Sequence, residues 1–172
     1  MTEATQAEPT FAMPTPQSEH LRLKPFVGKF RSEVKMWMGP GEPMVSTGTM
    51  VNTLELGGLY LQHDYMGDAH DGPFGQFEGK GFWGYNTTTQ EYEGLWIDNA
   101  CTTMQLDRGQ VDARGKIWEM KSEVLCPQTR QPYKKRSVIT LTDHDHHRLE
   151  MFMTGPDGAE MKTMEINYER VV

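Results

Sequence analysis

The chain has 172 residues and a formal net charge of −7, with 37% hydrophobic and 24% charged residues. These values are typical of one globular domain, and the negative charge argues against a nucleic-acid partner, whose phosphates require a basic surface. No apolar run approaches the roughly 20 residues that a membrane helix needs, so no membrane partner is expected. The spacing of Cys101 and Cys126 predicts two reduced thiols rather than a zinc site.

The first 17 residues predict a flexible leader, and residues 18–172 predict a single domain. The leader is rich in Thr, Pro, Ala and Glu and lacks the basic and apolar regions of a signal peptide, so we expect a cytoplasmic location. The domain begins with at most two helical turns, with Ser18 as the N-cap, because Pro25 disfavours a longer helix. The apolar residues of this segment suit a plug at one end of a barrel.

From residue 28 onward, apolar and polar residues alternate with a period of two between turns rich in Gly, Pro and Asp. This pattern predicts nine or ten antiparallel strands in sequence order. The expected strands lie near 28–38, 46–56, 59–66, 79–86, 91–99, 102–106, 116–125, 134–142, 148–154 and 160–169, with a short piece at 110–112. An open sheet of this size would leave two long edges, so we expect an all-β, up-and-down barrel, with a two-sheet sandwich as the alternative.

The aromatic stretch GKGFWGYNTTTQEYEGLWIDN predicts a hairpin whose loop is residues 87–90. This loop places Trp83 opposite Gly94 and Trp96 opposite Gly81. Each tryptophan ring would then cover a glycine of the neighbouring strand, an arrangement that permits strong curvature without loss of packing. We expect this aromatic face to point into the barrel.

Several short motifs follow one another in a specific order along the chain. They are His20-x-x-Leu23-x-x-Phe26-Val27-Gly28-Lys29-Phe30, Leu56-Gly57-Gly58-Leu59-Tyr60-Leu61, Gly84-Tyr85-Asn86, Trp96-Ile97-Asp98 and Gly158-Ala159-Glu160-x-Lys162-x-Met164-Glu165-Ile166-x-Tyr168-x-Arg170. Together they resemble the bacterial DUF1579 family over residues 19–170. The resemblance implies a lipocalin-like (calycin) barrel and no activity, because the family has no assigned function. The chain departs from the family pattern at Leu59, where Arg is expected, and at Phe30, where Trp is expected.

The inward aromatic face and the thirteen methionines favour a cavity for a mostly apolar ligand, because methionine is flexible and polarizable. Our first hypothesis is therefore a non-enzymatic barrel that binds a small apolar or amphipathic molecule and needs no cofactor. The expected lining residues are Trp83, Tyr85, Tyr92, Trp96, Asp98, Trp118 and Met120.

Two alternatives stay open. The first alternative is an enzyme, a cyclase, isomerase or hydrolase. Asp98 lies two residues from Trp96 on the same strand face, where a desolvated carboxylate would have a raised pKa. Such a carboxylate could act as the general acid or base. Asp98 could instead end the strand and cap the following turn. The second alternative is a structural module that forms a homodimer through an outer face carrying Phe82, Leu95 and Ile97.

The turn Asp143–His147 carries side chains that suit divalent metals. Five consecutive residues cannot all reach one ion, and a solvated turn explains them without a ligand. We therefore predict no metal site. If this turn does bind a metal ion, the candidate ligands are His144, His146 and His147.

Two further features have simple structural explanations. His20 and His63 are candidates for haem ligation, but hydrogen-bonded structural histidines explain them equally, and His20 could brace the plug against the barrel. The basic cluster Lys134-Lys135-Arg136 predicts a solvated strand end rather than a binding patch.

Overall fold

The computed structural model describes residues 12–68, 75–126 and 129–171, and most of the expected leader lies outside these ranges. Over the described residues the chain forms α1 (Ser18–Leu21), the 3-10 turns η1 (Lys24–Phe26) and η2 (Leu56–Gly58), and ten strands. The strands are β1 (Gly28–Met36), β2 (Met44–Glu55), β3 (Tyr60–Gly67), β4 (Glu78–Asn86), β5 (Glu91–Asp98), β6 (Gln105–Val111), β7 (Ile117–Leu125), β8 (Pro132–Leu141), β9 (His146–Thr154) and β10 (Glu160–Arg170). None of the helices in these ranges has the length and apolar character needed to span a membrane.

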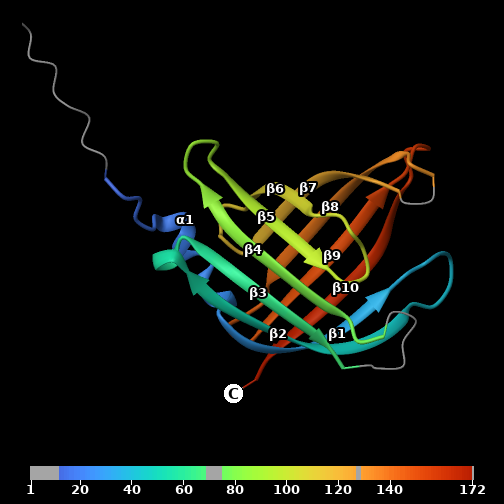
Figure 1. Cartoon of the computed structure of the whole chain (residues 1–172), viewed down its shortest axis with the longest axis horizontal. Helices are drawn as coiled ribbons and strands as arrows, with labels where there is room; N and C mark the ends of the chain where they lie inside the picture. Colours follow the sequence, from blue (N-terminus) through green and yellow to red (C-terminus); the bar gives the residue numbers. More distant parts are fainter. Residues whose placement is uncertain (1–11, 69–74, 127–128, 172) are drawn as a thin grey trace, which may run out of the picture.

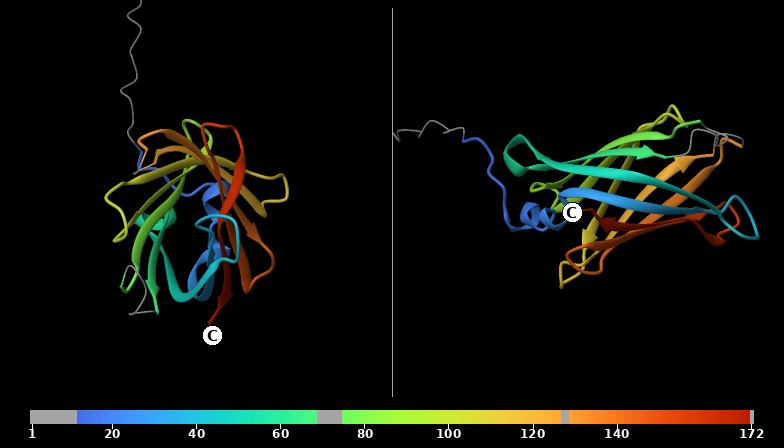
Figure 2. Two further views of the ribbon diagram at one scale, coloured as in Figure 1. Left: turned by 90° about the vertical axis from the view of Figure 1, so that its right-hand side faces the viewer. Right: turned by 90° about the horizontal axis from the view of Figure 1, so that it is seen from below.

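The ten strands form one closed antiparallel barrel in which each strand pairs with its sequence neighbour (Figure 1). The barrel closes where β1 pairs with β10, from Phe30 opposite Arg170 to Met36 opposite Met164. Figure 2 shows α1 at one end of the barrel and the loop between β1 and β2 at the other. Closure leaves no free sheet edge, so the predicted up-and-down barrel is confirmed and the sandwich is excluded.

One predicted strand boundary is wrong. Residues 105–111 form a single strand, β6, where the sequence predicted two pieces separated near Asp107 and Gly109. Gly109 is needed for this strand, because a Cβ atom there would overlap the backbone of Glu119 on β7. The continuous strand was missed because its inward positions before Val111 are polar or glycine, which removes the usual apolar alternation.

The β4–β5 hairpin has the predicted register, with Trp83 opposite Gly94 and Gly81 opposite Trp96, and its aromatic face points inward. The Trp96 ring covers Gly81, where a Cβ atom would lie 2.9 Å from the indole. The prediction for Trp83 is wrong, because a Cβ atom at Gly94 would have no atom closer than 3.9 Å. The Trp83 ring packs instead against Phe26 of the plug, with the ring centroids 5.4 Å apart.

The short helical segments close one end of the barrel, as expected for a plug. Phe26 is 2% exposed, and His20 is buried with its Nδ1 accepting the backbone N–H of Gln17, which is the N-cap in place of the predicted Ser18. The guanidinium of Arg170, near the chain end, donates to the carbonyls of Val27 and Pro25 at 2.6 and 2.7 Å. The last strand therefore holds the plug in place.

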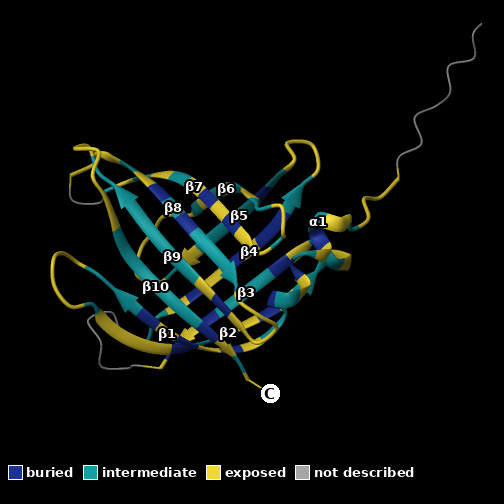
Figure 3. Cartoon of the chain, turned by 180° about the vertical axis from the view of Figure 1, so that it is seen from behind, coloured by how far each residue is buried: buried dark blue, intermediate teal, exposed yellow. Residues whose placement is uncertain are grey.

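Two groups of buried hydrophobic residues pack inside the barrel, and Figure 3 colours the buried positions dark blue along the ribbon. The group next to the plug consists of Leu23, Phe26, Leu61, Trp83, Tyr92, Trp118 and Met120. The second group consists of Phe30, Val34, Met50, Tyr65 and Tyr168. Further toward the other end, the inward positions are only half-buried, among them Trp96, Asp98, Gln105, Ser122, Met151 and Met164. The lumen is therefore packed at the plugged end and more accessible at the opposite end, which we call the open half.

Candidate functional site in the barrel lumen

A charged pair lies on the inner wall of the open half. Lys135 on β8 is only 4% exposed, and its Nζ lies 3.0 Å from Asp107 Oδ2 and 3.0 Å from Gln105 Oε1 on β6. Lys134 and Arg136 are the outward neighbours of Lys135 on the same strand. The prediction of a solvated basic cluster is therefore wrong for Lys135, whose side chain enters the lumen.

Three polar atoms around this pair are buried and have no hydrogen-bond partner: Asp107 Oδ1, Ser122 Oγ and Ser137 Oγ. Ser122 lies directly opposite Lys135 in the β7–β8 ladder, and Ser137 is two residues further along β8. A buried polar group without a partner costs about 1–3 kcal/mol, so such atoms are uncommon in folded proteins. A ligand or ordered water that bonded to these atoms would remove that cost.

The polar wall has room for a methyl group beside Asp107. Gly94 on β5 is directly opposite Asp107 on β6, and both face the lumen. A Cβ atom at Gly94 would touch only Asp107 at 3.9 Å and Met120 at 4.0 Å, which are ordinary van der Waals distances. The lumen beside Asp107 therefore has room for one added methyl group.

Two histidines face the middle of the lumen. His63 on β3 hydrogen-bonds through Nδ1 to Asn52 Oδ1 at 2.8 Å, and burial lowers the pKa of His63 to about 4. The His147 ring on β9 stacks on Tyr168 with centroids 4.3 Å apart, and burial, followed by the nearby His63, lowers the pKa of His147 to about 3. Both imidazoles are thus neutral near pH 7.

The two oxygens of Asp98 are both engaged. Oδ2 accepts the indole N–H of Trp96 at 3.0 Å, and Oδ1 accepts the backbone N–H groups of Ala100 and Cys101, each at 3.0 Å. These contacts orient the Trp96 ring and cap the turn after β5. They fit the strand-ending, turn-capping role expected for Asp98 rather than the role of a general acid or base.

The structure divides the expected ligand-binding residues between two places. Trp83, Tyr92, Trp118 and Met120 lie in the packed group next to the plug, with Tyr85 against it, whereas Trp96 and Asp98 lie in the open half. Asp107 and Lys135 were missed. A signal for Lys135 was present, since counting back by twos from Ile139 on the same strand places residues 137 and 135 on the inner face.

The candidate metal ligands do not converge. The His144 side chain is 80% exposed and bonds to Asp145, and the His146 side chain is 51% exposed and bonds to Asp143. His147 points the other way, into the barrel. Within the part of the chain that the structure describes, no three His, Cys, Asp or Glu side chains are placed to hold a metal ion.

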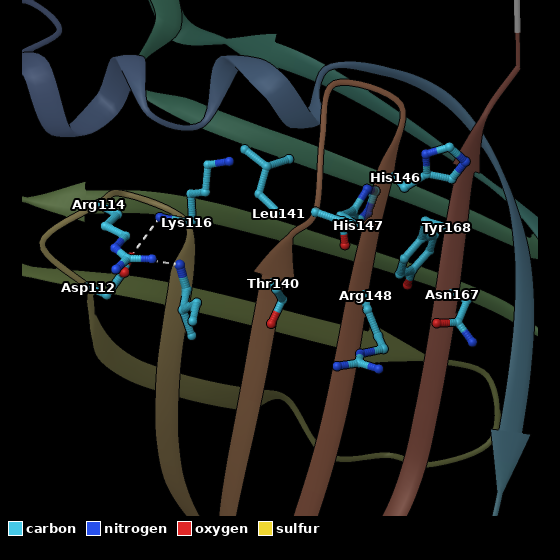
Figure 4. Close-up of a pocket in the computed structure, with 12 residues that line it drawn as sticks. Asp112, Arg114, Lys116, Thr140, Leu141, His146, His147, Arg148, Asn167 and Tyr168 are labelled. Atoms are coloured by element: carbon cyan, nitrogen blue, oxygen red, sulfur yellow. Dashed lines mark hydrogen bonds between the residues drawn. The ribbon is translucent and has the colours of Figure 1, made fainter.

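A hollow of about 550 Å³ lies at the plugged end, beside the β6–β7 turn and strands β8 to β10 (Figure 4). Its cationic lining residues are Arg114, Lys116 and Arg148. Asp112 shapes the turn, because its Oδ1 accepts the backbone N–H of Lys116 at 2.7 Å. None of the unpartnered buried atoms found among the described residues lines this hollow, so the lumen is the stronger candidate.

Comparisons with known proteins support the fold. The crystal structure of Rv2717c from M. tuberculosis matches with a TM-score of 0.64 at 12% sequence identity, covering 91% of this chain and 99% of that one. The S-type phycobiliprotein lyase CPES from Guillardia theta matches with a TM-score of 0.60 at 10% identity and the same coverage. At these identities the likeness shows a shared barrel and nothing about activity.

Comparison with curated proteins gives no match. The model of the DUF1579 family, described as a protein family of unknown function, matches residues 15–170, nearly the whole chain. The order of short motifs along the sequence predicted this result. The chain belongs to the DUF1579 family.

Proposed function

We propose that this protein is a non-enzymatic, cytoplasmic barrel that binds a small amphipathic molecule in the open half of its lumen. The observation that carries the proposal is the Lys135–Asp107 pair, held inside the barrel next to unpartnered polar atoms and a glycine position that has room for a methyl group. Burying an ion pair is rarely the most stable choice for a protein interior, so its presence needs another explanation. Ligand recognition provides one.

The chemistry of the wall defines the ligand class. Asp107 Oδ1 offers an acceptor, and the hydroxyls of Ser122 and Ser137 can donate or accept. Lys135 has used two of its three donors, on Asp107 and Gln105. A matching ligand therefore carries donors and acceptors on one edge. Its remaining surface is apolar, since the rest of the lumen offers mainly aromatic and aliphatic side chains.

Thermal-shift and tryptophan-fluorescence titrations with lauric acid, quercetin, haemin and an anilinonaphthalene sulfonate dye test the proposal. We expect at least one probe to raise the melting temperature and change the fluorescence with saturable, one-to-one binding. Native mass spectrometry of gently purified protein would reveal a co-purified molecule. The absence of any bound molecule in all these measurements would contradict the proposal.

A matched pair of variants locates the site. Gly94→Phe fills the space beside Asp107 and is expected to weaken binding at least tenfold. Gly94→Ala adds a methyl group that the space accepts, so it is expected to bind as the wild type does. Equal affinity of both variants would place the bound molecule elsewhere.

A homodimer is the second candidate, and an exposed apolar patch favours it. Phe82, Ile97 and Leu106 lie on the outer face of β4, β5 and β6 and are 42%, 40% and 68% exposed. Leu95 lies between Phe82 and Leu106 in the ladders. Contiguous exposed apolar residues often mark an interaction surface. Light scattering after size exclusion should then show a dimer that Ile97→Asp converts to a monomer, and a monomeric wild type would refute this candidate.

A further inference from the structure

The mouth of the open half is rich in methionine. Four of these residues form one row across four neighbouring strands: Met44 is paired with Met36, Met36 with Met164, and Met164 with Met151. Each member occupies an inward position of its strand, in alternation with outward polar residues such as Lys35. We call these four residues the methionine row.

The row ends at a β-bulge. The ladder between β10 and β9 shifts register between Lys162 and Met164, whereas the ladder between β1 and β10 is regular as far as Met36 opposite Met164. Met164 therefore faces the lumen by the same alternation as Tyr168. The bulge changes the parity of the residues before it, so that Lys162 lies outward, where its Nζ bonds to Glu150. Bulges often re-aim a side chain beside a functional site.

Core packing accounts for only one member of the methionine row, Met164, which packs against the second buried group. Met50 and Met120 are 6% and 3% exposed and are ordinary members of the buried groups. Met44 is 47% exposed, and Met36, Met151 and Met164 are only half-buried. Met36, Met44 and Met151 belong to neither buried group.

The spacing suits a shared ligand. Directly opposite residues in an antiparallel ladder have Cβ atoms about 5 Å apart, and side chains on the concave face of a barrel converge. Methionine has three flexible torsions, so neighbouring sulfur atoms of the row can approach a common point. Met36 and Met164 are the two central members of the row.

The donors select the kind of ion. Thioethers are neutral and soft, and soft sulfur ligands favour Cu(I) over the harder divalent metals, which prefer imidazole or carboxylate. The nearest charged side chains on these strands, Lys35, Glu150 and Glu165, occupy outward positions. We propose that the methionine row is a binding site for a soft monovalent cation of the Cu(I) type, independent of the organic ligand proposed above.

Calorimetric titration with Ag⁺, a redox-inert soft cation, in chloride-free buffer tests this site. A Cys101→Ser/Cys126→Ser background removes the thiols, which would compete for silver. We expect one Ag⁺ per chain, with at least a tenfold weaker affinity in Met36→Leu and Met164→Leu. Met38→Leu is the matched control, because Met38 is 76% exposed and outside the row.

Methyl NMR of methionine-labelled protein gives a second readout that needs no variant. Ag⁺ should shift the methyl signals of the row and leave those of the buried Met50 and Met120 in place. Uniform small shifts over all methionines, or leucine variants that bind Ag⁺ as tightly as Met38→Leu, would overturn the proposal. The row would then be only an apolar lining of the mouth.

Discussion

The two histidines in the lumen should make the protein lose stability as the pH falls from 7 to 5. In the folded state the pKa of His63 is about 4 and that of His147 about 3, because burial disfavours the charged imidazole. In the unfolded chain both return to the ordinary value of 6.5. Over this pH range the unfolded chain therefore binds more protons than the folded one, and acid favours unfolding.

The size of the effect follows from these values. Between pH 7 and pH 5, proton binding to the unfolded chain lowers the free energy of unfolding by about 2 kcal/mol for each histidine, or about 4 kcal/mol for the pair. His146 acts in the opposite direction, because its hydrogen bond to Asp143 raises its pKa and stabilises the folded state at lower pH. That side chain is solvent-exposed, so the loss should dominate.

Urea unfolding followed by tryptophan fluorescence at pH 7 and pH 5 measures the loss directly. We expect His63→Gln and His147→Phe each to reduce the difference between the two pH values by about 2 kcal/mol, whatever their effect at pH 7. His144→Gln, whose side chain is 80% exposed in the wild type, is the control and should leave the difference unchanged. A wild-type difference that neither interior variant reduces would refute the assignment of these pKa values.

Two further substitutions test the packing of the barrel. Gly79→Ala should cost about 1–3 kcal/mol, since the added Cβ would overlap the Trp96 ring, whereas Gly94→Ala in the same hairpin should be nearly neutral; equal melting temperatures for the two would contradict the packing described. Arg170→Lys should cost about 2 kcal/mol because an ammonium cannot reproduce the forked bonds to the plug carbonyls, and faster proteolysis within the plug would accompany the loss. Unchanged proteolysis would show that the last strand does not hold the plug.

The sequence predicted the parts of the fold in which local chemistry and packing agree. The loop at 87–90 and the inward aromatic face predicted a single register for the β4–β5 hairpin, and the structure has that register. Strands with apolar alternation, such as β1 and β7, were also located correctly. Closure then followed from the number of consecutive antiparallel strands.

The candidate site was harder to predict because it breaks the pattern that reveals strands. Three of the four inward positions of β6 carry Gln105, Asp107 and Gly109, and only the last, Val111, is apolar, so periodicity does not indicate an inner face. Lys135 appeared as part of a basic surface cluster. Trp83 was expected to cover Gly94, but in the structure its ring packs against Phe26 and leaves room for a methyl group at Gly94. Functional sites are where local and global preferences are expected to disagree.

Stability measurements can test whether the Lys135–Asp107 pair serves ligand binding or the fold. If Lys135 and Asp107 serve the ligand rather than the fold, replacing both by apolar residues should not harm the barrel. We expect Lys135→Met/Asp107→Leu to be as stable as the wild type or more stable by about 1–4 kcal/mol, since removing a buried ion pair is often neutral or favourable.

The single variant Lys135→Met is the informative comparison. It should lose about 3–5 kcal/mol because Asp107 is left without its counter-charge. Probe binding should be weakened in both variants, so stability and binding would change independently. A double variant as unstable as the single one would show that the pair holds the sheet together. The polar side chains of the open half would then be required for stability rather than for ligand binding.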